Sequence, residues 1–163
     1  MRVFVIYITL IGIGLSGCVT IVSPTGQSND SAAAIGTANT TDAEDQAVAS
    51  INQARSDQGQ SSLTTDPRLI RAAQAHAQDM VSQGYFSHTG ANGSTVRSRV
   101  TAQGFRGCFW AENISNGRAS ASEVVNSWMG SPGHRANILH RKARQVGVGK
   151  SGNTWVAVFA APC

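Results

Sequence analysis

Residues 124–139 read VVNSWMGSPGHRANIL, and this stretch is the most informative one for the fold of the surrounding chain. Its first half carries large apolar side chains at helical spacing, namely Val124, Val125, Trp128 and Met129. Ser120 and Glu123 have the spacing of a capping box at the start of a helix. Gly130 and Pro132 then end the helical pattern. We therefore predict an amphipathic helix with its apolar side buried.

Three more helices are predicted upstream, at residues 41–59, 66–84 and 95–103. The first opens with a Thr-x-x-Glu capping box, the second with Asp-Pro, and a glycine stands at or just after the end of each. His76 lies on the apolar face of the second helix. We expect it to be a buried histidine bonded to a backbone or hydroxyl partner, rather than a ligand.

Three strands are predicted in the second half, at Cys108–Ile114, Val146–Lys150 and Thr154–Ala160. A Ser-Gly-Asn turn joins the last two into a hairpin. The final strand is almost continuously apolar, which indicates that helices cover both of its faces. The fold class is therefore α+β, and we expect a three-layer α/β/α sandwich.

The first eighteen residues have the pattern of an export signal that ends in a lipidation site. An apolar run from Val3 to Leu15 follows Arg2 and is shorter than the roughly 20 residues of a membrane-spanning helix. The sequence Leu-Ser-Gly-Cys that ends at Cys18 resembles a bacterial lipobox, whose cysteine becomes the acylated N-terminus; an ordinary signal with a stray cysteine is the alternative. Val19 after this cysteine resembles the outer-membrane sorting pattern of bacteria that have two membranes.

This pattern predicts three parts: a signal peptide at 1–17, a lipidated cysteine with a flexible tether at 18–43, and a domain at 44–163. The tether region is rich in small polar residues and has too few large apolar ones to form a core. Lipidation would hold the protein on a membrane of the cell envelope. With Cys18 acylated, Cys108 and Cys163 remain as an even pair in an oxidising compartment, and we predict a disulfide between them. Two separate buried thiols are the alternative.

Acidic side chains are scarce in the second half of the chain. From residue 81 to the C-terminus there are nine Lys or Arg residues and only two acids, Glu112 and Glu123. With so few acids among so many cations, we expect each carboxylate to be bound by a specific partner side chain. The candidate partners are His88 and His134.

Several segments occur in an order that resembles the CAP superfamily, also called the SCP domain, in its bacterial branch. They are Phe86-Ser87-His88, Ala111-Glu112-Asn113-Ile114, the stretch 124–139, the His76 segment and Val146-Gly147-Val148-Gly149. The resemblance implies an α/β/α sandwich with a central antiparallel sheet and a cleft lined by two histidines and acidic residues. His88 and His134 match the cleft histidines, and Glu112 matches the glutamate of the Glu-Asn motif.

The chain departs from the family pattern at the second cleft glutamate. In many eukaryotic members this residue stands three positions after the helix tryptophan, and here that position is Ser131. Glu123 lies eight residues earlier, about 12 Å along a helix, so it cannot simply replace the missing carboxylate. We expect Glu123 to cap its helix, and a place in the cleft is the alternative for both Glu123 and Ser131.

Two interpretations of the cleft stay open. His88, His134 and Glu112 have the ligand count of a catalytic zinc site, although their wide separation gives no local motif. Alternatively, Glu112 accepts a hydrogen bond from one imidazole and fixes its tautomer in a polar cluster. A metal-dependent hydrolase and a serine hydrolase through Ser87 or Ser131 are less favoured, because neither serine lies in a Gly-x-Ser-x-Gly elbow and no general base is evident.

We favour a non-catalytic module that binds a small or lipidic ligand or an envelope component, since the resemblance includes relatives that bind sterols and fatty acids. A structural or interaction protein with a vestigial cleft is the second alternative. The basic run His140-Arg141-Lys142-Ala143-Arg144 would attract anionic envelope surfaces, or is simply a solvated face. Nucleic acid is excluded as a partner by export, and no oligomeric state is predicted.

Overall fold

A computed structural model describes residues 35–163. The helices of this part are α1 (Ile35–Ser56), α2 (Pro67–Gln83), α3 (Val96–Ala102), α4 (Ala121–Met129) and α5 (Pro132–Ile138). The strands are β1 (Thr64–Thr65), β2 (Gly107–Ser115), β3 (Gln145–Ser151) and β4 (Thr154–Pro162). They form one sheet in the order β1-β3-β4-β2.

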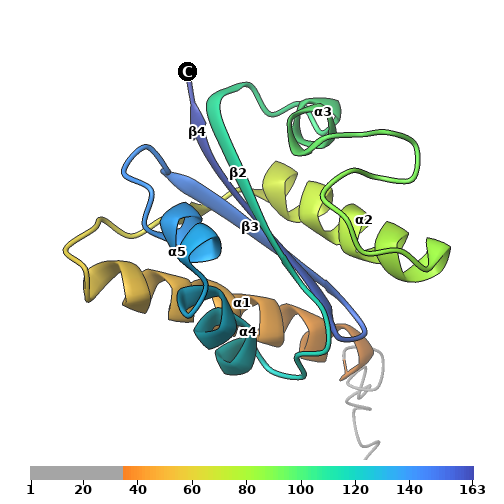
Figure 1. Cartoon of the computed structure of the whole chain (residues 1–163), viewed down its shortest axis with the longest axis horizontal. Helices are drawn as coiled ribbons and strands as arrows, with labels where there is room; N and C mark the ends of the chain where they lie inside the picture. The colour runs from red at the N-terminus through yellow and green to blue at the C-terminus, as the bar shows by residue number, and fades with distance from the viewer. Residues whose placement is uncertain (1–34) are drawn as a thin grey trace, which may run out of the picture. The chain divides into compact units, whose positions relative to one another are not determined.

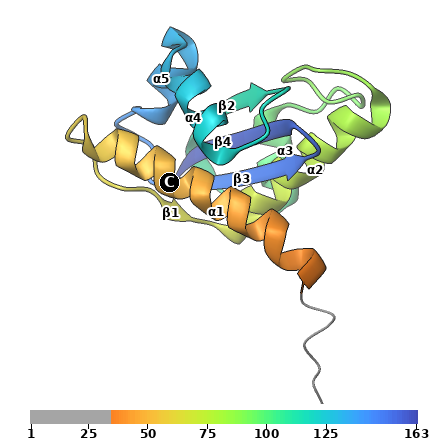
Figure 2. The same ribbon diagram turned by 90° about the horizontal axis from the view of Figure 1, so that it is seen from below.

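Helices cover both faces of this sheet (Figure 1). Helices α1, α4 and α5 lie on one side and α2 and α3 on the other, which Figure 2 shows from below. The predicted three-layer α+β sandwich is confirmed. The sheet is antiparallel except for the short β1, which pairs with β3 in parallel.

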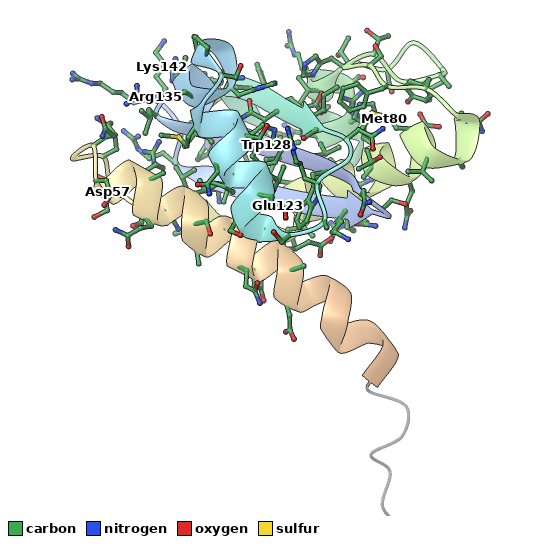
Figure 3. The ribbon with its side chains drawn as sticks, turned by 60° about the horizontal axis from the view of Figure 1, so that its bottom comes forward. Asp57, Met80, Glu123, Trp128, Arg135 and Lys142 are labelled. Atoms are coloured by element: carbon green, nitrogen blue, oxygen red, sulfur yellow. A yellow bond between two sulfur atoms is a disulfide. The ribbon has the colours of Figure 1, made fainter. Side chains whose placement is uncertain are left out.

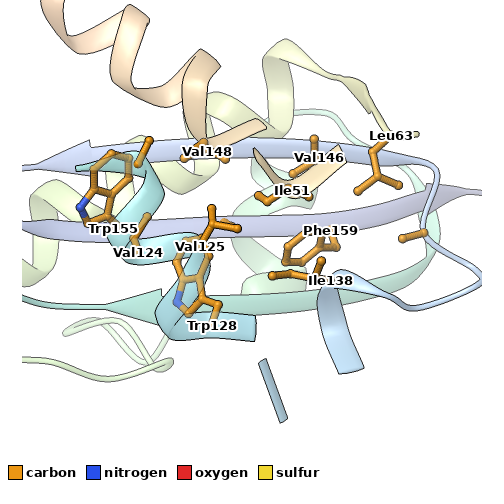
Figure 4. Packing of buried hydrophobic residues seen from close by; sticks show 14 residues of the cluster. Ile51, Leu63, Val124, Val125, Trp128, Ile138, Val146, Val148, Trp155 and Phe159 are labelled. Atoms are coloured by element: carbon orange, nitrogen blue, oxygen red, sulfur yellow. The ribbon is translucent and has the colours of Figure 1, made fainter. Parts of the chain in front are cut away.

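Strand β4 lies at the centre and divides the core in two. Trp155, Ala157 and Phe159 point into the cluster under α1 and α4 (Figure 4). Val156, Val158 and Ala160 point into the cluster under α2 and α3. This alternation explains why the strand is apolar at every position, since each face of it is buried.

Two glycines in β3 allow α2 to pack directly on the sheet. A Cβ atom at Gly147 would lie 2.2 Å from the backbone carbon of Leu69, and one at Gly149 would lie 2.3 Å from the backbone nitrogen of Gln74. Both distances are far below van der Waals contact. The Gly-x-Gly pattern of this strand therefore sets how closely α2 approaches, and α2 carries His76 into the core.

Local capping explains where most helices begin. Asp66 caps α2 by accepting a hydrogen bond from the Arg68 amide, and Gly84 ends the helix in the left-handed conformation at φ 67°. Thr95 and Ser98 form a capping box on α3, and Ser120 caps α4. The predicted boundaries of these three helices are confirmed to within a residue or two.

Three features differ from the sequence-based prediction. Helix α1 begins at Ile35 rather than at Thr41, so the end of the predicted tether is helical. Glu44 does not close a capping box, because its carboxylate accepts a hydrogen bond from the Lys150 amide at 2.9 Å. The two-residue strand β1 and the short helix α5 were not predicted, although Ser131-Pro132 is a common way to start a helix.

A buried arginine ties α1 to α5. Arg55 is 1% exposed, and its guanidinium donates to the carbonyls of Ser61, Ile138 and His140, at 2.8, 2.6 and 3.3 Å respectively. The last two carbonyls lie at the end of α5, where the helix leaves backbone oxygens without partners. A cation at this end also complements the helix dipole. The position of α5, and of His134 on it, therefore depends on Arg55.

The predicted disulfide is present in the structure. Cys108 on β2 and Cys163 after β4 are bonded, with Cα atoms 4.9 Å apart. Antiparallel pairing of β2 with β4 brings the two ends together. Within residues 35–163 no helix is long and apolar enough to cross a membrane. The signal peptide, Cys18 and most of the tether lie outside the described residues.

Candidate functional site

Glu112 is the centre of the candidate site. It lies on β2 opposite Val158, so its side chain is on the face that α2 and α3 cover. The side chain is only 3% exposed. Arg99 Nη2 of α3 donates to Oε2 at 2.7 Å, and His88 Nδ1 lies 2.9 Å from Oε1. Both carboxylate oxygens are therefore engaged by cationic or imidazole donors.

His88 joins this buried carboxylate to solvent. Its side chain is 57% exposed, and it lies in the loop between α2 and α3. A carboxylate oxygen only accepts hydrogen bonds, so Nδ1 carries the proton and the neutral ring leaves Nε2 as an acceptor. A hollow of about 230 Å³ borders this ring and is lined also by Thr89, Thr95, Val96 and Glu112.

The helix that carries His134 is attached to β2. His134 lies in α5, and Asn113 Nδ2 of β2 donates to its backbone carbonyl at 3.0 Å. Asn137 Nδ2 of the same helix donates to the carbonyl of Glu112 at 3.2 Å, which fastens α5 to this edge strand. Burial lowers the pKa of His134, and the charge of His88 lowers it further. A cleft shared by His134 and His88 stays a prediction.

His76 lies behind Glu112 in the core. The ring is fully buried, its Nε2 is 3.0 Å from the carbonyl oxygen of Ser87, and the same atom is 4.0 Å from Glu112 Oε1. Burial, followed by the positive charge of Arg99, lowers the pKa of this histidine. The prediction of a buried ring with a backbone partner is confirmed, although the ring also supports the wall of the site.

Glu123 and Ser131, the alternative cleft residues, make contacts at the starts of helices. The Glu123 carboxylate accepts a hydrogen bond from the Ala119 amide at 3.0 Å, and Ser120 Oγ accepts from the Glu123 amide at 3.3 Å. Figure 3 shows Glu123 at the end of α4 that is remote from α5. These contacts match the expected capping role. Ser131 is the N-cap residue of α5, and its side chain makes no capping hydrogen bond.

Within residues 35–163, the three predicted zinc ligands do not form a preformed metal site. No group of three or more His, Cys, Asp and Glu side chains in residues 35–163 is arranged to hold a metal ion. Glu112 has both oxygens engaged, and the Arg99 guanidinium beside it opposes a second cation. Two imidazoles remain as donors, and zinc binding stays a prediction.

The two serines considered as nucleophiles, Ser87 and Ser131, have no hydrogen bond to a histidine ring among the described residues. Ser87 Oγ accepts a hydrogen bond from the Thr89 amide at 3.0 Å. In the described part of the chain, no serine hydroxyl is hydrogen-bonded to a histidine ring. A serine needs such a base in order to act as a nucleophile.

Arg99 is the site residue that the sequence did not reveal. It lies 13 positions from Glu112 and in a different element, so no local motif connects the two. The excess of cations over acids did predict that Glu112 would have a specific partner. A guanidinium is better suited than an imidazole for this role, because it is always charged and has five donors. The Arg99 guanidinium donates hydrogen bonds to Glu112 and to the carbonyls of His88 and Ser94.

Part of the basic run 140–144, which follows α5, is held by contacts within the protein. Arg144 Nη1 donates to the carbonyls of Arg141 and Ala143, and the His140 ring stacks on Phe109 with centroids 4.1 Å apart. Lys142 is exposed beside α5 (Figure 3). Exposed cations therefore remain here, and a role in binding anionic surfaces stays a prediction.

Fold and site together define the family. The sequence model of the Cysteine-rich secretory protein family, CAP, matches residues 48–159. The chain therefore belongs to the CAP family, as the resemblance in its motifs predicted, and it is of the bacterial type. It is 35% identical over 118 residues to YkwD of Bacillus subtilis, an uncharacterised protein, covering 71% of this chain and 46% of that one.

A second relative is YlbC of Bacillus subtilis, an uncharacterised membrane protein that is 28% identical over 109 residues, covering 67% of this chain and 32% of that one. The chain thus spans less than half the length of either relative. Among solved structures, the fold is similar to an extracellular SCP-domain protein of Bacillus anthracis, with TM-score 0.73 and 24% identity over 75% of this chain and 41% of that chain. It is also similar to an outer surface protein of Borrelia burgdorferi, with TM-score 0.63 and 22% identity over 71% of this chain and 90% of that chain.

Proposed function

We propose that this protein is an exported, lipid-anchored CAP-domain protein that binds a small ligand in the cleft around His88 and catalyses no reaction there. The observation that carries the proposal is the state of Glu112. A general base must lie within hydrogen-bond reach of the proton that it takes from the substrate. The Glu112 side chain is only 3% exposed, and it already accepts hydrogen bonds from Arg99 and His88. We therefore assign Glu112 the role of a support that orients His88.

The imidazole of His88, which Glu112 holds in place, supplies the polar binding group of the cleft. With Nδ1 donating to Glu112, His88 Nε2 accepts a hydrogen bond from a ligand hydroxyl, amine or amide. The hollow beside it combines the hydroxyls of Thr89 and Thr95 with the apolar side chain of Val96. Such a wall suits a ligand with a polar end and an apolar body, which is the chemistry of a lipidic molecule or an envelope component.

Several observations support export and anchoring. The N-terminal apolar run and lipobox are the sequence pattern of a lipoprotein, and the Cys108–Cys163 disulfide fits an oxidising compartment. Similar proteins are described as extracellular, as an outer surface protein and as a membrane protein. We propose that Cys18 holds the domain on the envelope, and on the outer membrane in bacteria that have two.

The test is ligand retention. The full chain is purified from native membranes, extracted with organic solvent, and the extract is analysed by mass spectrometry, with metal analysis of the same sample. A bound molecule is expected in the wild type and in His140→Ala, a histidine variant outside the cleft, and it should be lost in His88→Ala. Equal retention in both variants would place the ligand elsewhere. An empty wild-type extract would favour an interaction role, and stoichiometric zinc lost in His88→Ala would favour the metal hypothesis.

The anchor is tested separately. Cys18→Ser should abolish incorporation of labelled palmitate and release the protein from the membrane fraction. Unchanged fractionation and labelling in this variant would show that Cys18 is not the anchor.

A further inference from the structure

Val81 and Phe86 are the exposed large hydrophobic side chains of residues 35–163, and they lie together. Each of them is 50% exposed. Both line a hollow of about 460 Å³, which the buried residues Met80 and Thr154 also line. Apolar side chains that are scattered singly on a surface need no explanation, whereas a group of them with a polar rim marks a site of contact. We call Val81, Phe86 and this hollow the apolar tip.

The apolar tip lies at one end of the domain, where α2 ends and β3 turns into β4. Val81 belongs to the last turn of α2, and Gly84 ends that helix. Residues 151–153 form the turn between β3 and β4 and line the hollow from the other side, together with Asn116 after β2. Polar groups of this turn therefore surround the two exposed apolar side chains.

Helix α1 brings the N-terminal part of the chain to the same end of the domain. Glu44 of α1 accepts a hydrogen bond from the Lys150 amide at 2.9 Å, and Lys150 directly precedes the turn that lines the hollow. Figure 1 shows the first turns of α1 next to the β3–β4 turn. From Ile35 the chain leads back to Cys18, so the proposed lipid anchor attaches at the end of the domain that carries the apolar tip.

This attachment favours a bilayer as the partner of the apolar tip. Only residues 19–34 separate Cys18 from α1. At no more than about 3.6 Å per residue, they keep the domain within roughly 60 Å of the membrane. A second contact with the same membrane is then intramolecular, and a short linker gives it a high effective concentration. Two side chains that would bind lipid only weakly by themselves are therefore sufficient.

From these observations we propose that the apolar tip inserts into the surface of the membrane that anchors the protein. Val81 and Phe86 enter the boundary between headgroups and acyl chains, as apolar and aromatic side chains of interfacial proteins do. Asn116, Ser151 and Asn153 lie at the level of the headgroups. This inference rests on the proposed anchor at Cys18. It also fixes the orientation of the domain, with the far end of α1, at Ser56, pointing away from the bilayer.

The test is fluorescence quenching of the full chain in vesicles of phosphatidylcholine and phosphatidylglycerol with brominated acyl chains. Phe86→Trp places a tryptophan in the apolar tip, and Ser56→Trp places one at the exposed far end of α1. The emission above that of the wild type, which has three tryptophans, is compared with the emission in unbrominated vesicles. For Phe86→Trp it should fall at least about twofold, because bromine quenches only at short range, and for Ser56→Trp it should not change.

A second pair of variants tests the apolar character of the contact. Val81→Asp, added to Phe86→Trp, should restore the emission, because a buried carboxylate opposes insertion. Ser56→Asp in the same background adds the same charge at the far end of α1 and should leave the quenching in place. Restored emission in both, or in neither, would overturn the assignment of Val81 to the contact.

Labelling with palmitate reports on the anchor independently of the quenching. A labelled protein in which Phe86→Trp is quenched no more than Ser56→Trp would overturn the membrane contact and leave the anchor in place. Quenching of Phe86→Trp without labelling would overturn the anchor and support the contact, and the absence of both would overturn both. Protection of the Phe86→Trp emission from aqueous iodide, without quenching by lipid, would assign the apolar tip to a protein partner and overturn the inference.

Discussion

Replacing Arg99 by alanine should be among the most damaging single changes in this domain. The Glu112 side chain is 3% exposed and Arg99 10%, and their charged atoms are 2.7 Å apart. Removing one partner of a buried ion pair costs about 3–5 kcal/mol, because the other charge stays buried without compensation. His88 remains as a second partner for Glu112, so we expect about 4 kcal/mol. Domains are stable by only about 5–15 kcal/mol, so this loss is a large share.

Urea unfolding at neutral pH measures the effect. With a slope of about 2 kcal/mol per molar urea, the midpoint should fall by roughly 2 M in Arg99→Ala. Arg97→Ala is the matched control, since it makes the same change on the same helix at an exposed position, and its loss should be far smaller. Adding Glu112→Gln to Arg99→Ala removes the uncompensated charge and should recover part of the stability. Equal midpoints for Arg99→Ala and Arg97→Ala would show that Arg99 does not compensate the buried charge of Glu112. A double variant that loses the sum of its single changes would show the same.

Three further predictions concern the fold. Cys108→Ser opens a loop of 55 residues and should cost about 4 kcal/mol on the chain-entropy account, measured by unfolding of the oxidised protein; an unchanged midpoint would contradict this. The hydrogen bond from Arg68 lowers the pKa of Asp66 in the folded protein. The ionised Asp66 therefore stabilises the fold above the carboxyl's ordinary pKa, and this stabilisation is lost as the pH falls through the lowered pKa. Asp66→Asn should therefore cost about 1 kcal/mol at pH 7 and flatten the acid limb of the stability curve, and parallel acid limbs would argue against the role. Gly149→Ala should destabilise the fold by about 3 kcal/mol or more, because the added methyl group overpacks against α2. Gly133→Ala is the control and should be nearly neutral in the same unfolding assay, since its methyl group meets nothing within 4 Å. Similar losses of stability in both variants would count against the close approach of α2.

The parts of the fold that were predictable depend on local signals. Helix α2 has Asp-Pro at its start and a left-handed glycine at its end, and both ends agree with the prediction. The β3–β4 hairpin follows from a polar turn between apolar runs. The continuous apolar pattern of β4 correctly indicated helices on both faces, because each successive side chain enters one of the two core clusters.

The features that were missed depend on tertiary contacts. Strand β1 is two residues long and exists only because it lies beside β3. The N-terminal extension of α1 lacks a local stop signal, and the expected capping glutamate, Glu44, bonds to Lys150 far along the chain. Helix α5 is short, and the buried Arg55 fastens its end from a distant helix. None of these contacts leaves a periodic pattern in the sequence.

The same distinction applies to the candidate site. The motifs correctly indicated that Glu112 and a histidine would meet, and His88 lies 2.9 Å from it. The role of Arg99 could not be read from spacing, since it depends on how α3 packs over β2. That contact changes the chemistry, because it turns Glu112 from a candidate ligand into a buried support.

Glu112 fixes His88 with its proton on Nδ1 and so leaves Nε2 as the acceptor of the cleft. Nitrogen-15 NMR of the full chain, recorded where the His88 ring is neutral, measures this tautomer directly. We predict a protonated Nδ1 and a bare Nε2, and a loss of this preference in Glu112→Ala. A proton found on Nε2 in the wild type, or the same tautomer balance in both proteins, would contradict the account.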